Sequence, residues 1–385
     1  MLGNLLNVAI LSALLMASCG NNQPASDQVL KGAIAADPGS IIKFKTFTYI
    51  DAQGTGGEAF RFLMPADWQF TGGISWVLDQ PMMPATAAFQ VNNPQGKEAF
   101  EAFANHCYFW TNNQLTMNLF PPGSRYFGSE VKAPVYALDA LRDIILPDAR
   151  RDVSNFRIIE SKNLPELVQL LGAGQMGQGY VQSFADGAKI RFTYTEGGAN
   201  MEEEIYGVVE GISIPIQSMY GTTNNILWYV DYIFSFKAKQ GELEKHAKVF
   251  QTIVSSFRVN PQWQAKYSNF VEFLAQQQIQ RIHNIGEFSR MLSQMSDQMR
   301  QENLAQYEAR SNMYDRVSQN FGDYMLNINR YYDPYEGREV ELPSGYNHVW
   351  ANNRGEYILI DDPNFNPNVG SNLGWQLLKQ SGGGG

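Results

Sequence analysis

The residues of this 385-residue chain that could do chemistry are few and widely separated. Its four histidines lie in unlike segments, and their spacing does not indicate that they converge on a metal; they are His106, His246, His283 and His348. Cys107 follows His106, but neighbours on a strand point to opposite faces, so a buried, inert thiol is favoured over a nucleophile with its base. The sequence contains no HExxH, Walker loop, GxSxG or CxxC. We therefore predict no catalytic residue, no metal and no cofactor, and favour a non-enzymatic protein.

Two acidic or amide-rich stretches offer weaker alternatives. Glu202, Glu203 and Glu204 form an acidic run in a predicted hairpin, where alternation would place the outer two on one face. A carboxylate pair could serve glycoside hydrolysis only at a set separation across a cleft, so a solvated strand edge is favoured.

The second stretch, "DDPNFNPN", carries oxygen ligands at alternate positions, as a calcium loop does; these are Asp362, Asn364, Asn366 and Asn368. It lacks the glycine of such a loop, and Leu373 stands where a bidentate glutamate is needed. Because Asp-Pro and Asn-Pro commonly form turns, turns are favoured over a calcium site.

Aromatic residues gather near the C-terminus, beside asparagine and glycine. They are Tyr331, Tyr332, Tyr335, Tyr346, Trp350 and Tyr357. Such residues can stack against a sugar or a peptide, and Tyr346, Trp350 and Tyr357 are the candidate ligand-binding residues. The same residues could instead form a small core or dock this segment onto the rest of the chain, and docking is favoured.

Composition and charge limit the function classes. The chain is 44% hydrophobic, as in a globular protein able to bury a large core, and its charged fraction of 17% is below the usual value of about 25%. Its net charge is −9, its pI is about 5.1, and no lysine or arginine cluster occurs. A nucleic-acid binder would present a basic face to phosphates, so that class is excluded.

The N-terminus has the pattern of an export signal. The apolar run 5–17 is too short to span a bilayer and precedes the stretch "LMASC", which ends at Cys19. This stretch resembles the lipobox of bacterial lipoprotein precursors, although Met16 stands where leucine is usual and 1–7 holds no lysine or arginine. The resemblance implies a signal peptide over 1–18, a lipid on Cys19 and a polar tether over 19–40. It also implies an extracytoplasmic protein of the bacterial cell envelope, anchored to the membrane by acyl chains.

Residues 41–260 are predicted to form an α+β domain, with an antiparallel sheet flanked by helices and a possible division near 150. Short alternating runs parted by turn signals, such as 41–50, 58–70 and 85–93, favour antiparallel strands. The segment 98–110 is ambiguous between helix and strand, and 241–257 has the pattern of an amphipathic helix.

The same region resembles the PsbP/Mog1-like α/β sandwiches. The resemblance rests on Pro65 and Trp68 near its start and on a group near its end: Ser256, Phe257, Val259, Asn260, Pro261 and Trp263. It implies a fold used for docking and binding, and the fold alone does not define a function.

The chain is predicted to end in a long helix and a small β cap. Apolar residues step by three or four over about 261–325, where no proline follows Pro261. The segment 326–380 reads as a β-meander that needs to dock onto the helix or the sheet domain, and 381–385 is a glycine-rich tail. The helix could cover its apolar stripe with its own domain or with a partner.

Three functions follow from these features. The favoured one is a membrane-anchored envelope lipoprotein that binds or scaffolds a protein or glycan partner. The alternatives are an envelope hydrolase acting on glycan or peptide and a helix-mediated assembly factor.

Overall fold

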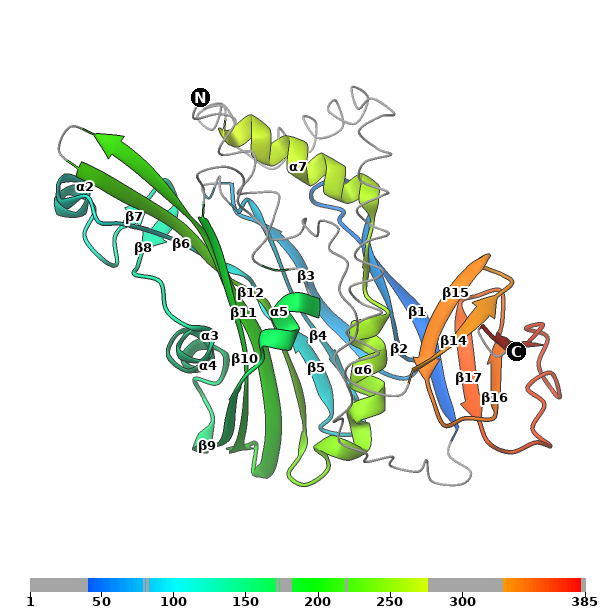
Figure 1. Ribbon diagram of the computed structural model, residues 1–385. Helices are drawn as coiled ribbons and strands as arrows, with labels where there is room; N and C mark the ends of the chain where they lie inside the picture. Colours follow the sequence, from blue (N-terminus) through cyan, green and yellow to red (C-terminus); the bar gives the residue numbers. More distant parts are fainter. Residues whose placement is uncertain are drawn as a thin grey trace.

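A computed structural model describes residues 41–78, 80, 83–170, 173, 182–218, 221–275 and 328–381. The predicted signal peptide and tether, with Cys19, lie outside the described residues, as does most of the predicted long helix, from 276 onward. The fold is rich in antiparallel sheet and contains few helices (Figure 1).

The largest sheet has ten strands and is built around one long double hairpin. Its main path, in spatial order, is β3 (Gln69–Trp76), β4 (Ala85–Asn92), β5 (Ala99–Ala102), β12 (Gly221–Lys239), β11 (Ala199–Ser218), β10 (Gln182–Glu196) and β9 (Ser154–Asn163). Three further strands join it beside β12, namely β6 (His106–Thr111), β7 (Arg125–Tyr126) and β8 (Ser129–Val131). The ambiguous segment 98–110 is thus two strands, β5 and β6, because both pair with the long β12.

The hairpin β10–β11 turns at Gly197 and Gly198, which both have positive φ angles of 57° and 79°. A two-residue turn of this type matches the twist of the strands, and glycine adopts it without strain. β11 is buried on both faces, with Val208 in one core cluster and Val209 in another.

The second sheet joins the two ends of the described chain. Its spatial order is β13 (Arg258–Val259), β2 (Glu58–Pro65), β1 (Ile42–Ile50), β17 (Glu356–Ile360), β16 (His348–Ala351) and β18 (Gln376–Leu377). Ile42 of β1 lies opposite Leu359 of β17 in an antiparallel register. The C-terminal segment therefore extends the sheet begun by the first strand.

The predicted C-terminal meander needs correction, because its strands belong to two sheets. β14 (Ile328–Asp333) and β15 (Arg338–Pro343) form a three-stranded sheet with β19 (Lys379–Gln380), while β16 and β17 join β1. In the fold, β17 forms backbone hydrogen bonds with β1 as well as with β16, whereas a free-standing meander would leave that edge of β17 unpaired. The sequence pattern does not show that the edge of β1 is available for this pairing.

The helices are short and lie against the sheets. α6 (Ala247–Ser255) packs on β2 and β15 and buries Phe250 and Ile253, while α7 (Pro261–Ala275) crosses near the end of β2 (Figure 1). The others are α2 (Gln114–Leu119), α3 (Ala137–Ala140), α4 (Leu146–Ala149) and α5 (Pro165–Leu170), with a π-helical turn at Leu141–Ile145 and a 3-10 turn at Leu243–His246. Among the described residues, no helix combines the length and the apolar character needed to cross a membrane.

Stacked aromatic rings fill the space between the two large sheets. Phe47 of β1 stacks on Phe70 of β3 with 4.2 Å between ring centroids, and Phe60 of β2 stacks on Phe89 of β4 at 5.4 Å. Offset ring pairs of this kind stabilise a core beyond their area burial. They fix the end of β1 close to β3, where the candidate site lies.

Candidate functional site

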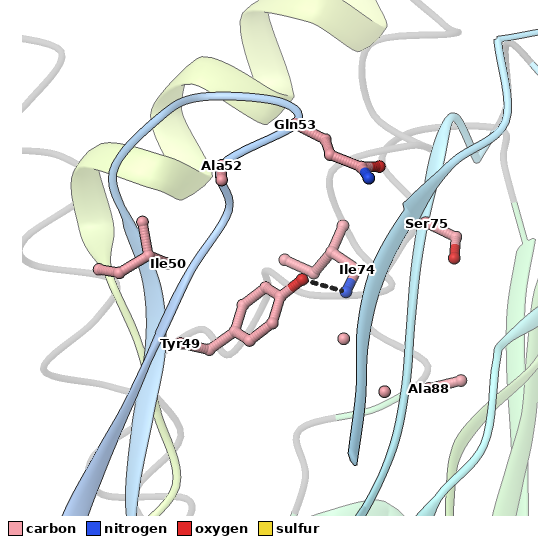
Figure 2. A pocket seen from close by; sticks show the side chains of 9 residues that line it. Tyr49, Ile50, Ala52, Gln53, Ile74, Ser75 and Ala88 are labelled. Carbon is pink, nitrogen blue, oxygen red and sulfur yellow. Dashed lines mark hydrogen bonds between the residues drawn. The ribbon is translucent and has the colours of Figure 1, made fainter. Parts of the chain in front are cut away.

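A pocket of about 420 Å³ lies between the end of β1 and the edge strand β3 (Figure 2). Its lining carries no charged side chain and comes from the β1 end, β3 and β4; the residues are Tyr49, Ile50, Ala52, Gln53, Gly72, Gly73, Ile74, Ser75 and Ala88. Such a lining suits a neutral ligand that combines apolar contact with a few hydrogen bonds.

Two glycines keep this pocket open. A Cβ atom on Gly73 would overlap the hydroxyl and ring of Tyr49, and one on Gly72 would overlap the carbonyl of Ala88. Both residues also have positive φ angles, 98° at Gly72 and 150° at Gly73, which side chains rarely allow. Glycine at 73 therefore allows the close approach of Tyr49 to β3, and glycine at 72 allows the close approach of the β4 backbone.

One edge of β3 faces the pocket. Among the described strands β3 pairs with β4 alone. Just after β3, the amide of Val77 points toward the β4 side and donates to the carbonyl of Pro84 at 2.7 Å. The amide of Ile74 points the other way and donates to the Tyr49 hydroxyl at 3.1 Å (Figure 2). Because backbone groups alternate in direction along a strand, Gly72 presents its N–H and C=O to the same side as Ile74.

A buried carboxylate holds the rim of the pocket. Asp51 is 1% exposed and accepts four hydrogen bonds. Two come from the turn after β1, from the amides of Gly54 and Thr55, both at 3.0 Å. The others come from the indoles of Trp76 on β3 at 3.2 Å and Trp263 on α7 at 2.8 Å. One side chain thus ties the end of β1 to β3 and α7.

The residues that carried the PsbP/Mog1 resemblance have structural tasks at this place. The Asn260 side chain accepts from the Gln262 amide at 2.8 Å at the start of α7, and Trp263 donates to Asp51. Ser256 accepts the amide of Leu63 in β2 at 2.8 Å. They position the helix against the sheet, and none of them lines the pocket.

Of the three C-terminal aromatic candidates, Tyr346 and Tyr357 are buried in the C-terminal sheets and Trp350 is half-buried there. Tyr357 is 1% exposed and donates to Asp333 at 2.6 Å, while Tyr346 is buried with the ammonium of Lys248 5.5 Å from its ring centroid. Trp350 is half-buried beside a cluster that contains Ile358 and Trp375. The three residues do not share one surface with the pocket.

The calcium-like stretch forms turns. Asp362 accepts the amide of Asn364 at 2.9 Å, and Asn366 accepts that of Asn368 at 3.0 Å. Asn368 also bonds the backbone of Trp375 in both directions, at 2.8 and 2.9 Å. Side-chain oxygens of three of the four residues thus serve turn hydrogen bonds.

The acidic run 202–204 lies inside the sheet rather than at a solvated edge, because β11 has β10 on one side and β12 on the other. Glu203 is fully buried and pairs with the guanidinium of Arg150, with Nε to Oε2 at 2.8 Å, and accepts from Tyr194. Glu202 and Glu204 face the opposite side and contact Arg191 and Lys189. All three carboxylates therefore have partners, which sequence alternation alone could not show.

The thiol and the histidine beside it point to different partners. Cys107 Sγ lies 3.2 Å from the Ser129 hydroxyl, and burial raises the pKa of the Cys107 thiol to about 12. His106 Nδ1 lies 3.4 Å from the Tyr108 hydroxyl. A thiol with a raised pKa is a poor nucleophile at neutral pH.

Comparisons with known proteins add little to these observations. No family model matches the chain, and no curated protein matches it. One solved structure similar to part of it is LpqN, a protein involved in cell envelope biogenesis of Mycobacterium tuberculosis; the match covers 57% of this chain and 92% of that chain at 10% identity, with a TM-score of 0.23. A likeness of this degree carries no argument about function.

Proposed function

We propose that this chain is a lipid-anchored binding protein of the bacterial cell envelope that takes an extended, uncharged peptide segment in the pocket between β1 and β3. The single observation behind the binding role is the pocket itself, where an edge strand, two glycines and the Tyr49 hydroxyl meet without a charged group. The anchor is supported by the lipobox-like sequence that ends at Cys19.

A peptide fits this site because β3 can accept it as a further strand. Recognition by strand addition uses main-chain hydrogen bonds for affinity and alternate side-chain pockets for selectivity. Gly72 offers one N–H and one C=O, and Ile50, Ile74 and Ala88 offer apolar contact on the two sides. A charged peptide would have to leave water without finding an opposite charge in the lining, which disfavours it.

The binding role is tested by selecting peptides from a library of uncharged decapeptides against the full-length protein in detergent. We expect selected peptides to lose binding to Ser75→Trp, because Ser75 is exposed at the pocket and an indole would fill it. Ser154→Trp on the opposite edge strand, β9, is the matched control and should bind as the wild type does. Equal binding by both variants would refute the site.

The anchor is tested separately by mass spectrometry of the native N-terminus. We expect an acylated Cys19 and release of Cys19→Ser from the membrane fraction. An intact Met1 with a free Cys19 thiol would refute the anchor and leave the binding site unaffected.

A further inference from the structure

Three potential metal ligands from distant parts of the sequence meet beside α6. Glu242 precedes the 3-10 turn Leu243–His246, and His246 closes that turn four residues later. Glu98 lies directly before β5, in the loop that follows β4. One ligand atom from each of these three residues lies within 4.8 Å of the others.

Glu98 is a buried carboxylate that points into this cluster. It is 7% exposed, and its Oε2 accepts a hydrogen bond from the side-chain Nδ2 of Asn93 at 2.7 Å. A Cβ atom on Gly96 would overlap that same oxygen, so glycine at this position lets the Glu98 carboxylate lie close to the loop backbone. Its Oε1 lies 3.6 Å from Nε2 of His246, which is longer than a hydrogen bond.

Among the described residues, no lysine or arginine forms an ion pair with Glu98, whose ion-pair contact is with His246. Burying an ionised carboxylate is costly unless a cation compensates it. A protonated His246 would supply one positive charge against two carboxylates. A divalent ion would neutralise both carboxylates and leave the imidazole neutral, as a metal ligand must be.

We propose that Glu98, Glu242 and His246 bind a divalent transition-metal ion, with zinc as the best match. One imidazole nitrogen and two carboxylate oxygens form a ligand set that zinc accepts, with a fourth position left for water. Asn93 holds the Glu98 carboxylate from behind, as outer partners of metal ligands do. The ion would join the β4–β5 loop to the start of α6, two elements that are far apart in the sequence.

Within the described part of the chain, Lys245 competes with a metal for Glu242. Lys245 Nζ lies 3.5 Å from Glu242 Oε1, but the lysine side chain is 67% exposed and gains little from that contact. Glu242 is itself partly exposed and can turn toward Glu98 without disturbing the core. Metal binding therefore requires a side-chain rotation at the surface and no rearrangement of the sheet.

The experiment is zinc titration of the full-length protein in detergent, without a histidine tag, followed by isothermal calorimetry and by metal analysis after dialysis. We expect one bound zinc per chain and a higher melting temperature with zinc than with EDTA. His246→Gln and Glu242→Gln should abolish both effects, and Asn93→Ala should weaken binding about tenfold.

Matched controls separate this site from other zinc ligands. Glu244→Gln removes a neighbouring carboxylate that pairs with Arg191 instead, and His348→Gln and His283→Gln remove other histidines. All three should bind zinc as the wild type does. Failure of the wild type to take up zinc, or retention of one zinc by His246→Gln, would overturn the proposal, whereas neither result bears on the peptide site at β3.

Discussion

At the scale of single residues, Asp231 of β12 is the clearest case of a polar group that the fold holds in its interior. It is 3% exposed, and its Oδ1 accepts the amide of Tyr232 at 2.7 Å. Tyr232 has a φ angle of 50°, which is uncommon for a bulky residue, and it lies where the register between β11 and β12 shifts. The carboxylate thus supports a kink in the longest hairpin.

The second oxygen of Asp231, Oδ2, meets no hydrogen-bond donor within the described residues. Burial therefore raises the pKa of the Asp231 carboxyl to about 7. In the unfolded chain an aspartate has a pKa of about 3.9. The folded state holds the proton more tightly, so the free energy of unfolding decreases as the pH rises from about 4 to about 7 and stays lower above that.

We predict that Asp231→Asn removes this loss. The amide keeps an oxygen for Tyr232 and carries no charge, so the variant should gain about 2–3 kcal/mol relative to the wild type between pH 5 and pH 8. Urea unfolding of both proteins at the two pH values measures the difference. The exposed Asp152→Asn controls for loss of a carboxylate, and a wild-type-minus-variant difference that does not change with pH would contradict the prediction.

At the scale of elements, Asp51 shows how one side chain fixes the arrangement of β1, β3 and α7. Its four donors come from the turn after β1, from Trp76 and from Trp263. Hydrogen bonds to a charged group contribute about 1.5–3 kcal/mol each, and a buried donor left without its acceptor costs more than the bond itself. The stacking of Trp263 on Tyr267, at 5.4 Å between ring centroids, depends on the same placement of α7.

Asp51→Asn should therefore destabilise the protein by about 2–4 kcal/mol, because the amide offers one acceptor oxygen where two now serve four donors. The free energy of unfolding in urea measures the loss. Asp67→Asn, at an exposed turn after β2, should change it by less than about 0.5 kcal/mol. We also expect peptides selected at the β3 pocket to bind Asp51→Asn more weakly, since the pocket rim is no longer held. An unfolding midpoint equal to that of the wild type would refute this role.

At the scale of the whole molecule, the pairing of β1 with β17 makes the first and the last parts of the described chain one structural unit. Leu359 of β17 is fully buried in a cluster with Phe44 of β1 and Leu63 of β2. The C-terminal strands thus complete the core of the N-terminal sheet. A substitution that destabilises β17 should therefore also destabilise β1.

Leu359→Ala should cost about 2–5 kcal/mol, as truncation of a buried leucine does. Hydrogen exchange should become faster in 42–50 as well as in 356–360, while strand β11 at 199–218 keeps its protection. Val369→Ala, at a residue that is 81% exposed, is the matched control and should leave exchange unchanged. Faster exchange confined to 356–360 would show that the two ends are independent.

The sequence by itself determined much of the local structure. Alternating apolar residues and glycine turns predicted antiparallel strands in 41–260, and the pattern of 241–257 predicted the helix that became α6, because these signals depend on neighbours a few positions apart. Its net charge predicts that it is not a nucleic-acid binder, and its N-terminal pattern predicts a lipid on Cys19, which lies outside the described residues.

Tertiary structure alone decided which distant residues meet. No periodicity shows that β17 pairs with β1, that Glu203 finds Arg150, or that Trp263 reaches Asp51. The same holds for the candidate sites. The pocket joins the end of β1 to Gly72 and Gly73, and Glu98 lies beside His246 although most of the sequence of the sheet domain separates them. The physical reason is that a sequence pattern reports the direction of a side chain relative to its own strand or helix, whereas a site depends on the register and packing of elements brought together from far along the chain.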